Sequence, residues 1–156
     1  MMTLSISNGM CGKMEKKLTK SHAKAYQRSN DEEWRIKPYS DWHRTLDRNL
    51  YMLDVDFIEW RFKKGELVAV GVMEITRVDM DKEVTGKYLD SILHRYKIRD
   101  MQASASRKVA SALNTNAYIV LFRYDCSEFW VYNLSNYTGW NHFDSYGMEK
   151  FLKDLN

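Results

Sequence analysis

The feature that most constrains the fold of this chain is a carboxylate inside its most apolar segment. The segment LVAVGVMEITRV, residues 67–78, places Glu74 among valines, an isoleucine and a methionine. Such a dense run of apolar and β-branched residues predicts a strand that is buried on both faces. A lone buried carboxylate is costly, so it either takes up a proton or finds a partner. The fold must therefore bring a partner to Glu74.

The segment before this strand predicts a β-hairpin. The run YMLDVDFIEWRF, residues 51–62, is also rich in β formers, and KKGE, residues 63–66, is a turn in which Gly65 supplies positive φ. A glycine inside a strand weakens it unless the backbone bends or another group approaches closely. Gly71 therefore predicts a bulge or a close contact in the second strand.

The rest of the chain alternates helical and extended patterns. Pro38 predicts a break, and Ser40 is a good N-cap for a helix over 40–48. Further helices are expected in the second half of 81–97, over 100–113 and over 145–156, and strands over 117–124 and 128–134. The expected inward stripes are Met101, Ala105, Val109 and Ala112 on the 100–113 helix, and Met148, Phe151 and Leu152 on the last helix.

This order of elements predicts an α/β or α+β sandwich with a mixed sheet and helices beside it. The chain has 156 residues, which suits one domain, and shows neither an internal repeat nor a linker, so a single domain over 1–156 is expected. Its net charge is only +3, from 24 basic and 21 acidic residues, which excludes a histone-like polycation but permits a local basic face.

A basic segment near the start of the chain, about 12–30, has the composition of a helix with a thin apolar face. Its cations include Lys16, Lys17, Lys20 and Lys24. Two interpretations stay open for these lysines. They form either the solvated face of a helix or an arm that contacts phosphates.

Acidic side chains accumulate in the predicted hairpin. Strand alternation places Asp54 and Asp56 on one face with Ile58 and Trp60, and it places Glu74 and Thr76 on one face with Val70 and Val72. Carboxylates brought together from paired strands repel one another, and a divalent cation offsets that repulsion. Mg²⁺ takes one or two carboxylates and keeps waters for substrate phosphates, so the pattern predicts a site for phosphodiester hydrolysis.

Ordinary structural roles are the alternative for the same acids. Asp54 would then be a hydrogen-bonded turn residue at the start of the strand. Glu59 would pair with Arg61 or Arg77 at the surface. Glu74 would form a salt bridge with Arg123 or contact a helix.

The words LDVDFIEW and VAVGVMEIT resemble the PD-(D/E)XK nuclease superfamily, and the resemblance spans about 40–134. It implies a restriction endonuclease-like core, in which a helix, three strands, a helix and a strand follow one another. It also implies that Asp56 and Glu74 bind Mg²⁺ or Mn²⁺, that the Ile75 carbonyl lies near the metal and that Asp54 is an accessory acid. Gln102, at the start of a later helix, would orient substrate or water.

The chain departs from this superfamily at one position, because Thr76 stands where the motif has a lysine. That lysine orients the attacking water and stabilises negative charge in the transition state. Three outcomes follow. Another cation supplies the charge, the protein cuts slowly without it, or the fold only binds nucleic acid. The candidate cations are Lys82, Lys87, Arg77 and Lys108.

Several other chemistries are disfavoured. The four histidines and two cysteines show no zinc spacing, and the chain has neither a P-loop nor a dinucleotide-binding glycine motif. Cys11 and Cys126 are too few for a disulfide framework, and the charges of the first residues follow an apolar stretch, the reverse of a secretory signal. A reduced, cytoplasmic protein with no membrane partner is therefore expected.

The expected function is a Mg²⁺- or Mn²⁺-dependent nuclease acting on DNA, and the alternative is a weakened nuclease-fold module that binds nucleic acid or a protein. Arg107 and Lys108 are expected to contact phosphates beside the acidic site. The aromatic run over 129–143 either packs in the core or offers Tyr137 or Trp140 to stack on a base. Many small nucleases of this kind act as homodimers, so a homodimer is an expected state.

Overall fold

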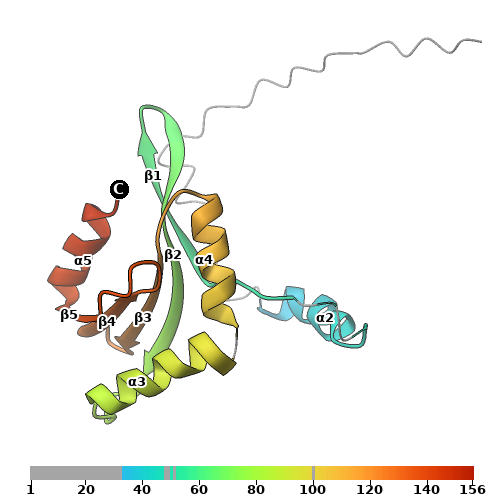
Figure 1. Cartoon of the computed structure of the whole chain (residues 1–156), viewed down its shortest axis with the longest axis horizontal. Helices are drawn as coiled ribbons and strands as arrows, with labels where there is room; N and C mark the ends of the chain where they lie inside the picture. Colours follow the sequence, from blue (N-terminus) through green and yellow to red (C-terminus); the bar gives the residue numbers. More distant parts are fainter. Residues whose placement is uncertain (1–32, 48–49, 51, 100) are drawn as a thin grey trace, which may run out of the picture. The chain divides into compact units, whose positions relative to one another are not determined.

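A five-stranded mixed β-sheet forms the centre of the described chain (Figure 1). Its strands lie side by side in the order in which they occur in the sequence. β2 and β3 are parallel, and every other neighbouring pair is antiparallel. The strands are β1 (Phe57–Lys63), β2 (Glu66–Val78), β3 (Ala117–Arg123), β4 (Glu128–Asn133) and β5 (Trp140–Asp144).

The computed structural model describes residues 33–47, 50, 52–99 and 101–156. Residues from Tyr39 onward form one unit, and the described residues before it belong to another, so each is described by itself. The expected basic segment over 12–30, with Lys16, Lys17, Lys20 and Lys24, lies outside the described residues. The expectation of a single domain over 1–156 stays a prediction.

The helices complete an α+β fold, as the sequence predicts. They are α2 (Glu33–His43), α3 (Gly86–His94), a π-helical turn η2 (Arg95–Arg99), α4 (Gln102–Ala112) and α5 (Ser145–Asp154). Because β2 and β3 are parallel, the chain needs a long crossover between them, and α3, η2 and α4 provide it. Thr85 caps α3 by accepting a hydrogen bond from the Tyr88 amide, and Asp144 caps α5 in the same way.

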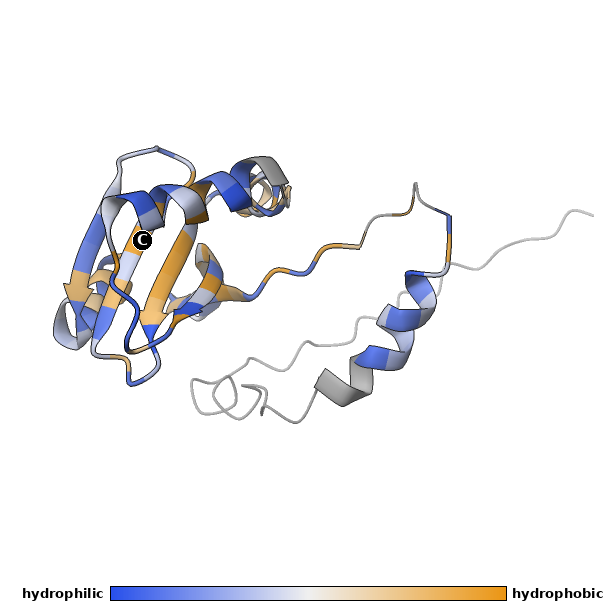
Figure 2. Cartoon of the chain, turned by 90° about the horizontal axis from the view of Figure 1, so that it is seen from below, coloured by the Kyte–Doolittle hydropathy of each residue, from blue (hydrophilic) through white to orange (hydrophobic). Residues whose placement is uncertain are grey.

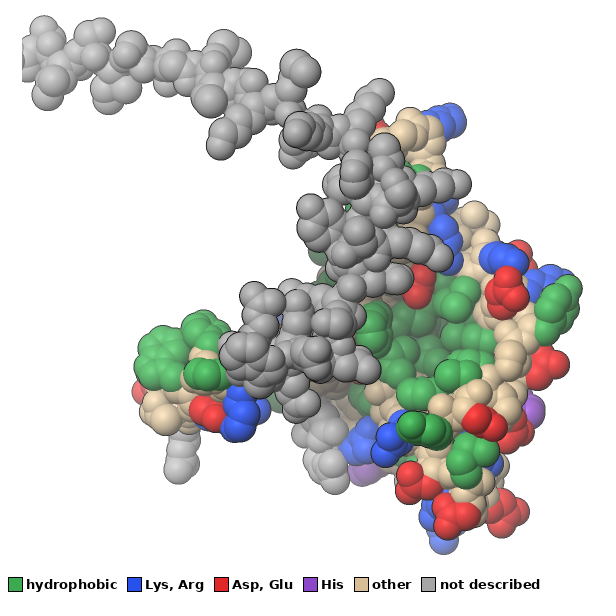
Figure 3. Space-filling model, turned by 180° about the vertical axis from the view of Figure 1, so that it is seen from behind, with side chains coloured by type: hydrophobic (Ala, Val, Ile, Leu, Met, Phe, Trp, Pro, Cys, Tyr) green, Lys and Arg blue, Asp and Glu red, His purple; other side chains and the backbone are tan. Residues whose placement is uncertain are grey.

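The sheet separates two hydrophobic cores. The first, on the side of α3 and α4, includes Val72, Ile119 and Leu121, and the second, on the side of α5, includes Met73 and Val120. Hydrophobic residues accordingly concentrate on the strands (Figure 2). Seen from behind, the molecule also shows hydrophobic side chains gathered in the middle of its surface, with charged side chains around them (Figure 3).

The β1–β2 hairpin forms as predicted, and Lys64 and Gly65 both have positive φ at its turn. Its register shifts between Glu59 and Trp60, opposite Gly71, which confirms the irregularity predicted at that glycine. The shift corrects one expectation. Val70 packs on the α5 side with Met73, whereas Val72 packs on the opposite side, because an irregular residue in the ladder changes which face its neighbours occupy.

Three further expectations are wrong. The break at Pro38 and a helix starting at Ser40 are replaced by α2, which runs through both residues and ends at His43. Residues 140–144, for which no strand is expected, form β5 and pair with β4. The stripe expected on 100–113 is not the buried one. α4 buries Ala103, Ser106 and Ala110, while Met101 is exposed.

The restriction endonuclease-like arrangement stays a prediction. The described chain has two strands between α2 and α3, where the resemblance implies three. No helix in the described ranges combines the length and the apolar composition needed to cross a bilayer.

The core predicts a large difference between two leucines of the sheet. Leu121 is fully buried in β3, and Leu67 at the start of β2 is 41% exposed. Replacing Leu121 by Ala leaves a cavity and should lower the free energy of unfolding by about 2–5 kcal/mol. Leu67→Ala is the matched control and should lower the free energy of unfolding much less. Equal losses for the two variants in urea unfolding curves would contradict the assignment of Leu121 to the core and Leu67 to the surface.

Candidate active site

Glu74 is the buried carboxylate around which the site is built. It lies on β2 with only 1% of its surface exposed and faces α4. Its Oε2 accepts a hydrogen bond from Nε2 of Gln102 at 3.0 Å, and its Oε1 accepts one from the Ser106 hydroxyl. Both donors come from the first turns of α4, four residues apart and therefore on one helix face. The buried carboxylate of Glu74 is thus paired with two uncharged hydrogen-bond donors.

Ser106 allows Glu74 to be stable both with and without a proton. The Ser106 hydroxyl also lies 2.9 Å from the main-chain carbonyl of Gln102, to which it can donate instead. When Glu74 is ionised, the hydroxyl donates to the carboxylate. When Glu74 is protonated, the hydroxyl donates to that carbonyl and accepts from the acid.

The two aspartates lie at the entrance to β1, within electrostatic reach of Glu74. Oδ2 of Asp56 accepts a hydrogen bond from the amide of Ile75 at 2.7 Å. Gln102 donates to the main-chain carbonyl of Asp54 at 2.8 Å with the same Nε2 that contacts Glu74. These bonds tie the segment before β1 to β2 and α4. Both aspartates are exposed, so the acids extend from the buried Glu74 to the solvent.

Burial raises the pKa of Glu74 above its ordinary value, because the charged form loses its hydration. The hydrogen bonds from Ser106 and Gln102 lower the pKa, and the negative charges of Asp56 and Asp54 raise it further. Asp54 and Asp56 therefore lie close enough to act on the charge of Glu74, and a positive charge placed beside Glu74 would favour its ionised form.

Arg95 lies beside Thr76, the residue that stands where the motif has a lysine. Thr76 lies two residues beyond Glu74 on the same face of β2. Its hydroxyl accepts a hydrogen bond from Nη2 of Arg95 at 3.3 Å and also contacts the hydroxyl of Tyr96. Both partners belong to the π-helical turn η2, so the crossover brings a guanidinium to the place where the resemblance expects an ammonium.

The four cations proposed from the sequence lie elsewhere. Arg77 follows Thr76 and so points to the opposite face of β2, where its guanidinium lies over the ring of Tyr124. The Lys82 ammonium lies over the ring of Tyr88, and Lys87 is exposed on α3. Lys108 is exposed on α4. None of these four has a described contact with Glu74 or Thr76.

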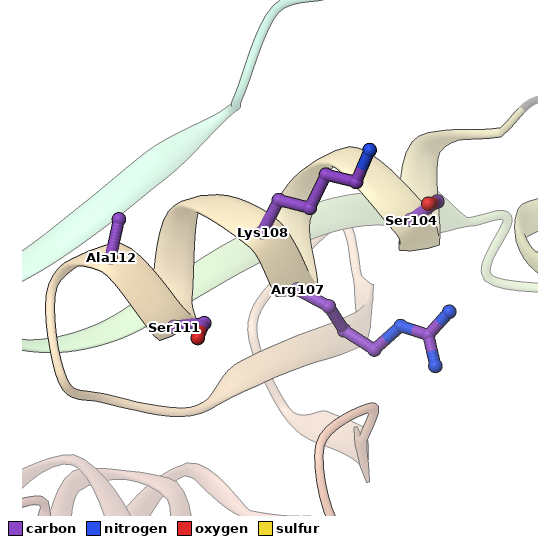
Figure 4. Close-up of a pocket in the computed structure, with 5 residues that line it drawn as sticks. All are labelled: Ser104, Arg107, Lys108, Ser111 and Ala112. Atoms are coloured by element: carbon purple, nitrogen blue, oxygen red, sulfur yellow. The ribbon is translucent and has the colours of Figure 1, made fainter.

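Arg107 and Lys108 leave α4 in different directions (Figure 4). Together with Ser104, Ser111 and Ala112 they line a shallow, open depression on the helix. The carboxylates of Glu74, Asp54 and Asp56 are not part of this depression. The Arg107 side chain contacts the hydroxyl of Tyr137 in the turn after β4.

The ordinary roles considered for the acids hold in part. Glu59 pairs with Arg61 at 3.1 Å, as that alternative predicts. Arg123 pairs with Glu128 at 3.1 Å and donates to two main-chain carbonyls, so it does not serve Glu74. Glu74 contacts a helix through neutral groups and has no salt bridge among the described residues.

The donor set suits a hard cation. Within the described ranges, no group of three or more acidic, histidine or cysteine side chains is arranged to hold a metal ion. Mg²⁺ commonly uses only one or two carboxylates and completes its shell with water and phosphate oxygens. Carboxylates that bind metal are themselves hydrogen-bonded, as Glu74 is by Gln102 and Ser106. Glu74 and Asp56 therefore fit such an ion, and Ile75, whose amide binds Asp56, directly follows Glu74 in the sequence.

Sequence reasoning missed Ser106 and Arg95. One signal pointed to Ser106, which lies four residues after Gln102 in a helix whose small residues allow close packing. Arg95 carried no such signal, since its approach to Thr76 depends on how the crossover packs against β2.

Comparison of the chain with protein-family models, with curated proteins and with solved structures finds no match. The site is therefore interpreted from its own geometry.

The raised pKa of Glu74 predicts how stability depends on pH. Above the unfolded-state value of about 4.5, the folded state holds a proton that the unfolded state has lost, so this group lowers stability as pH rises. Below that pH both states are protonated and the effect is absent. Glu74→Gln should remove the decline.

Urea unfolding of the unmodified protein and of Glu74→Gln from pH 4 to pH 8 checks this. The free-energy difference between the two should change in favour of the glutamine variant as pH rises. Glu66→Gln, at the exposed start of the same strand, serves as the control and should leave the profile unaltered. A Glu74→Gln profile parallel to that of the unmodified protein would refute the prediction.

Proposed function

We propose that this protein is a metal-dependent nuclease that hydrolyses phosphodiester bonds of nucleic acid, with DNA as the expected substrate, inside the cell. The observation that carries the proposal is that Gln102 joins Glu74 to the Asp54 carbonyl and the Ile75 amide binds Asp56, next to Thr76, which Arg95 contacts. A buried carboxylate near two further acids is unfavourable unless it is protonated or serves a cation. Such arrangements concentrate at functional sites.

Glu74 and Asp56 are the residues that would hold Mg²⁺ or Mn²⁺. Gln102 and Ser106 orient Glu74, and the Ile75 amide orients Asp56. When bound, such an ion polarises the phosphodiester and lowers the pKa of a bound water. Asp54 adds negative charge at the exposed side of the site.

Arg95 takes the part that the motif gives to a lysine. Strand geometry places Thr76 about 7 Å along β2 from Glu74, which leaves room for a phosphate between them. A guanidinium donates to phosphate oxygens through a planar fork, so Arg95 can bind the scissile phosphate from the side opposite the acids. Thr76 fixes the guanidinium by accepting one of its hydrogen bonds.

The reaction is an in-line displacement at phosphorus. The oxygen of a water molecule forms a bond to phosphorus, the bond to the leaving sugar oxygen breaks, and the proton lost by the water ends on that leaving oxygen. Negative charge grows on the phosphate oxygens in the transition state, and Arg95 stabilises it because it is already in position.

A homodimer belongs to the same proposal. The β1–β2 hairpin at the sheet edge exposes Phe57, Trp60 and Leu67, with 61% of the Phe57 side chain exposed. Exposed apolar surface of this kind favours association. A dimer would place two sites on one nucleic acid.

One observation favours a second candidate function, a nucleic-acid-binding module of low or no activity. Each Glu74 oxygen already accepts a hydrogen bond from α4, so the carboxylate is satisfied without a metal. Binding without cleavage is the outcome that would support this candidate.

Cleavage assays test the proposal. Plasmid and single-stranded DNA incubated with the protein should be cut in the presence of Mg²⁺ or Mn²⁺ and not in the presence of EDTA. Glu74→Gln and Asp56→Asn should each lower the rate by at least about 10²-fold, because each removes a charged ligand. Cleavage that survives both substitutions would exclude this site, and salt-sensitive binding with no cleavage would establish the binding module.

Arg95 gives a second and sharper test. Arg95→Gln should lower the cleavage rate by about 10²-fold, as the loss of one transition-state donor does. Arg95→Lys should recover part of that loss by restoring the positive charge. Arg77→Gln is the matched control, because it removes an arginine from the opposite face of the same strand. Equal rates for Arg95→Gln and the unmodified enzyme would refute the role of Arg95.

A further inference from the structure

A cluster of aromatic and basic side chains lies beside the acids, and the proposed reaction does not use it. Five residues make up this aromatic–basic cluster: Lys97, Arg107, Tyr132, Tyr137 and Trp140. The ammonium of Lys97 lies 4.2 Å from the ring centre of Tyr137 and 5.3 Å from that of Tyr132. The Arg107 guanidinium lies 5.7 Å from the ring centre of Tyr137, and the rings of Tyr132 and Trp140 are 5.3 Å apart.

The cluster presents both charge and ring surface to the solvent. Lys97 is exposed, and half of the surface of Tyr137 is exposed. Tyr132 is buried beneath them, and Lys97 also reaches its hydroxyl at 3.4 Å. Exposed cations that neutralise phosphates and an exposed ring that stacks on a base are the two elements of single-strand recognition.

Tyr137 is held in place rather than left to swing. Its amide donates to the main-chain carbonyl of Asn133, and the Asn133 side chain accepts from the amides of Ser135 and Asn136. The Arg107 side chain contacts its hydroxyl. A ring fixed in this way loses little conformational freedom when a base stacks on it, which favours binding.

The cluster is aligned with Glu74 across the sheet. Glu74 on β2 is paired with Ile119 on β3, which is paired with Tyr132 on β4, which is paired with Trp140 on β5. Paired residues lie on the same face, and neighbouring strands are about 4.8 Å apart, so Tyr132 lies about 10 Å from Glu74. The same two elements serve both places: α4 supplies Ser106 and Arg107, and η2 supplies Arg95 and Lys97.

We propose that the aromatic–basic cluster binds single-stranded nucleic acid, with a base stacked on Tyr137 and the adjoining phosphates held by Lys97 and Arg107. Bases offer their faces for stacking only when they are unpaired, so the cluster selects single strands over duplexes. This inference rests on the proposed function, because it names the substrate of the same site. The sheet row between Tyr132 and Glu74 is buried at Ile119, so a strand stacked on Tyr137 continues past η2, which supplies both Lys97 and Arg95, and its next phosphates meet Arg95 there.

Binding measured in EDTA tests this separately from cleavage. The full chain is titrated into labelled oligothymidylate, oligouridylate and a duplex of the same length, and fluorescence anisotropy is recorded. Single strands should bind more tightly than the duplex, and the two single strands show whether DNA or RNA is preferred. Tyr137→Asn, which removes the ring and tolerates the positive φ of that position, should raise the single-strand Kd about ten-fold. Tyr137→Phe keeps the ring and loses only the contact of its hydroxyl with Arg107, so it should raise the Kd much less than Tyr137→Asn.

The cations have their own signature. Lys97→Gln should reduce the slope of log Kd against log salt by about 0.7 for single strands. Tyr146→Asn removes an exposed tyrosine from α5 and is the control that should change nothing. If circular dichroism shows Tyr137→Asn unfolded, the Lys97 salt slope decides.

Three results would overturn the inference: no binding to either single strand, tighter binding to the duplex, or single-strand affinity unaffected by Tyr137→Asn. A protein that binds single strands through Tyr137 but cuts nothing with Mg²⁺ or Mn²⁺ would refute the nuclease and support the cluster. A protein that cuts nucleic acid but whose single-strand affinity is unaffected by Tyr137→Asn would support the nuclease and refute the role of the cluster.

Discussion

The hydrogen bonding of one buried carboxylate organises this fold. Glu74 is placed in the sheet by an otherwise apolar strand, and its hydrogen bonds within the described part of the chain come from α4, through Gln102 and Ser106. Those two donors fix the position of α4 over β2. Gln102 simultaneously holds the Asp54 carbonyl, so the segment leading into β1 is fixed by the same contact. Removing a donor from such a group leaves a buried acid unsatisfied, which costs far more than the loss of an ordinary surface bond. The same hydrogen bonds therefore hold the acidic site together and pack the crossover against the sheet.

The elements that the sequence predicts well are those defined by local pattern. The hairpin, with Gly65 in its turn, follows from alternation and turn chemistry, and the last helix buries Met148, Phe151 and Leu152 as expected. The buried face of α4 could not be read in this way, because periodicity counts Ser106 as polar and Met101 as apolar. The core residue opposite Ser106 is an acid, so polarity there is an advantage. The error over Val70 has a similar origin, since alternation fails where the ladder register shifts.

The candidate site likewise contains residues that the sequence predicted and residues that it did not. Asp54, Asp56 and Glu74 were identified from strand alternation and Gln102 from the family resemblance, and hydrogen bonds or electrostatic interactions link all four in the fold. The cations expected opposite Thr76 were Arg77, Lys82, Lys87 and Lys108, whereas the structure brings Arg95 there, from 19 residues along the chain. Arg95 directly follows α3 with an α-helical backbone conformation, and the packing of the crossover against β2 brings it to Thr76. Spacing along one element does not describe such a contact between two elements.

The parallel pairing of β2 and β3 has a consequence for the order in which the molecule assembles. The β1–β2 hairpin closes over a two-residue turn, whereas β3 can join only after the whole crossover has been laid down, and local pairings form faster than distant ones. Glu74 thus spends the early part of folding in water and loses its hydration when α4 docks. That docking is the step at which the ionised acid resists burial. In the native state, opening of α4 away from the sheet is accordingly the local fluctuation that deprotonation of Glu74 promotes.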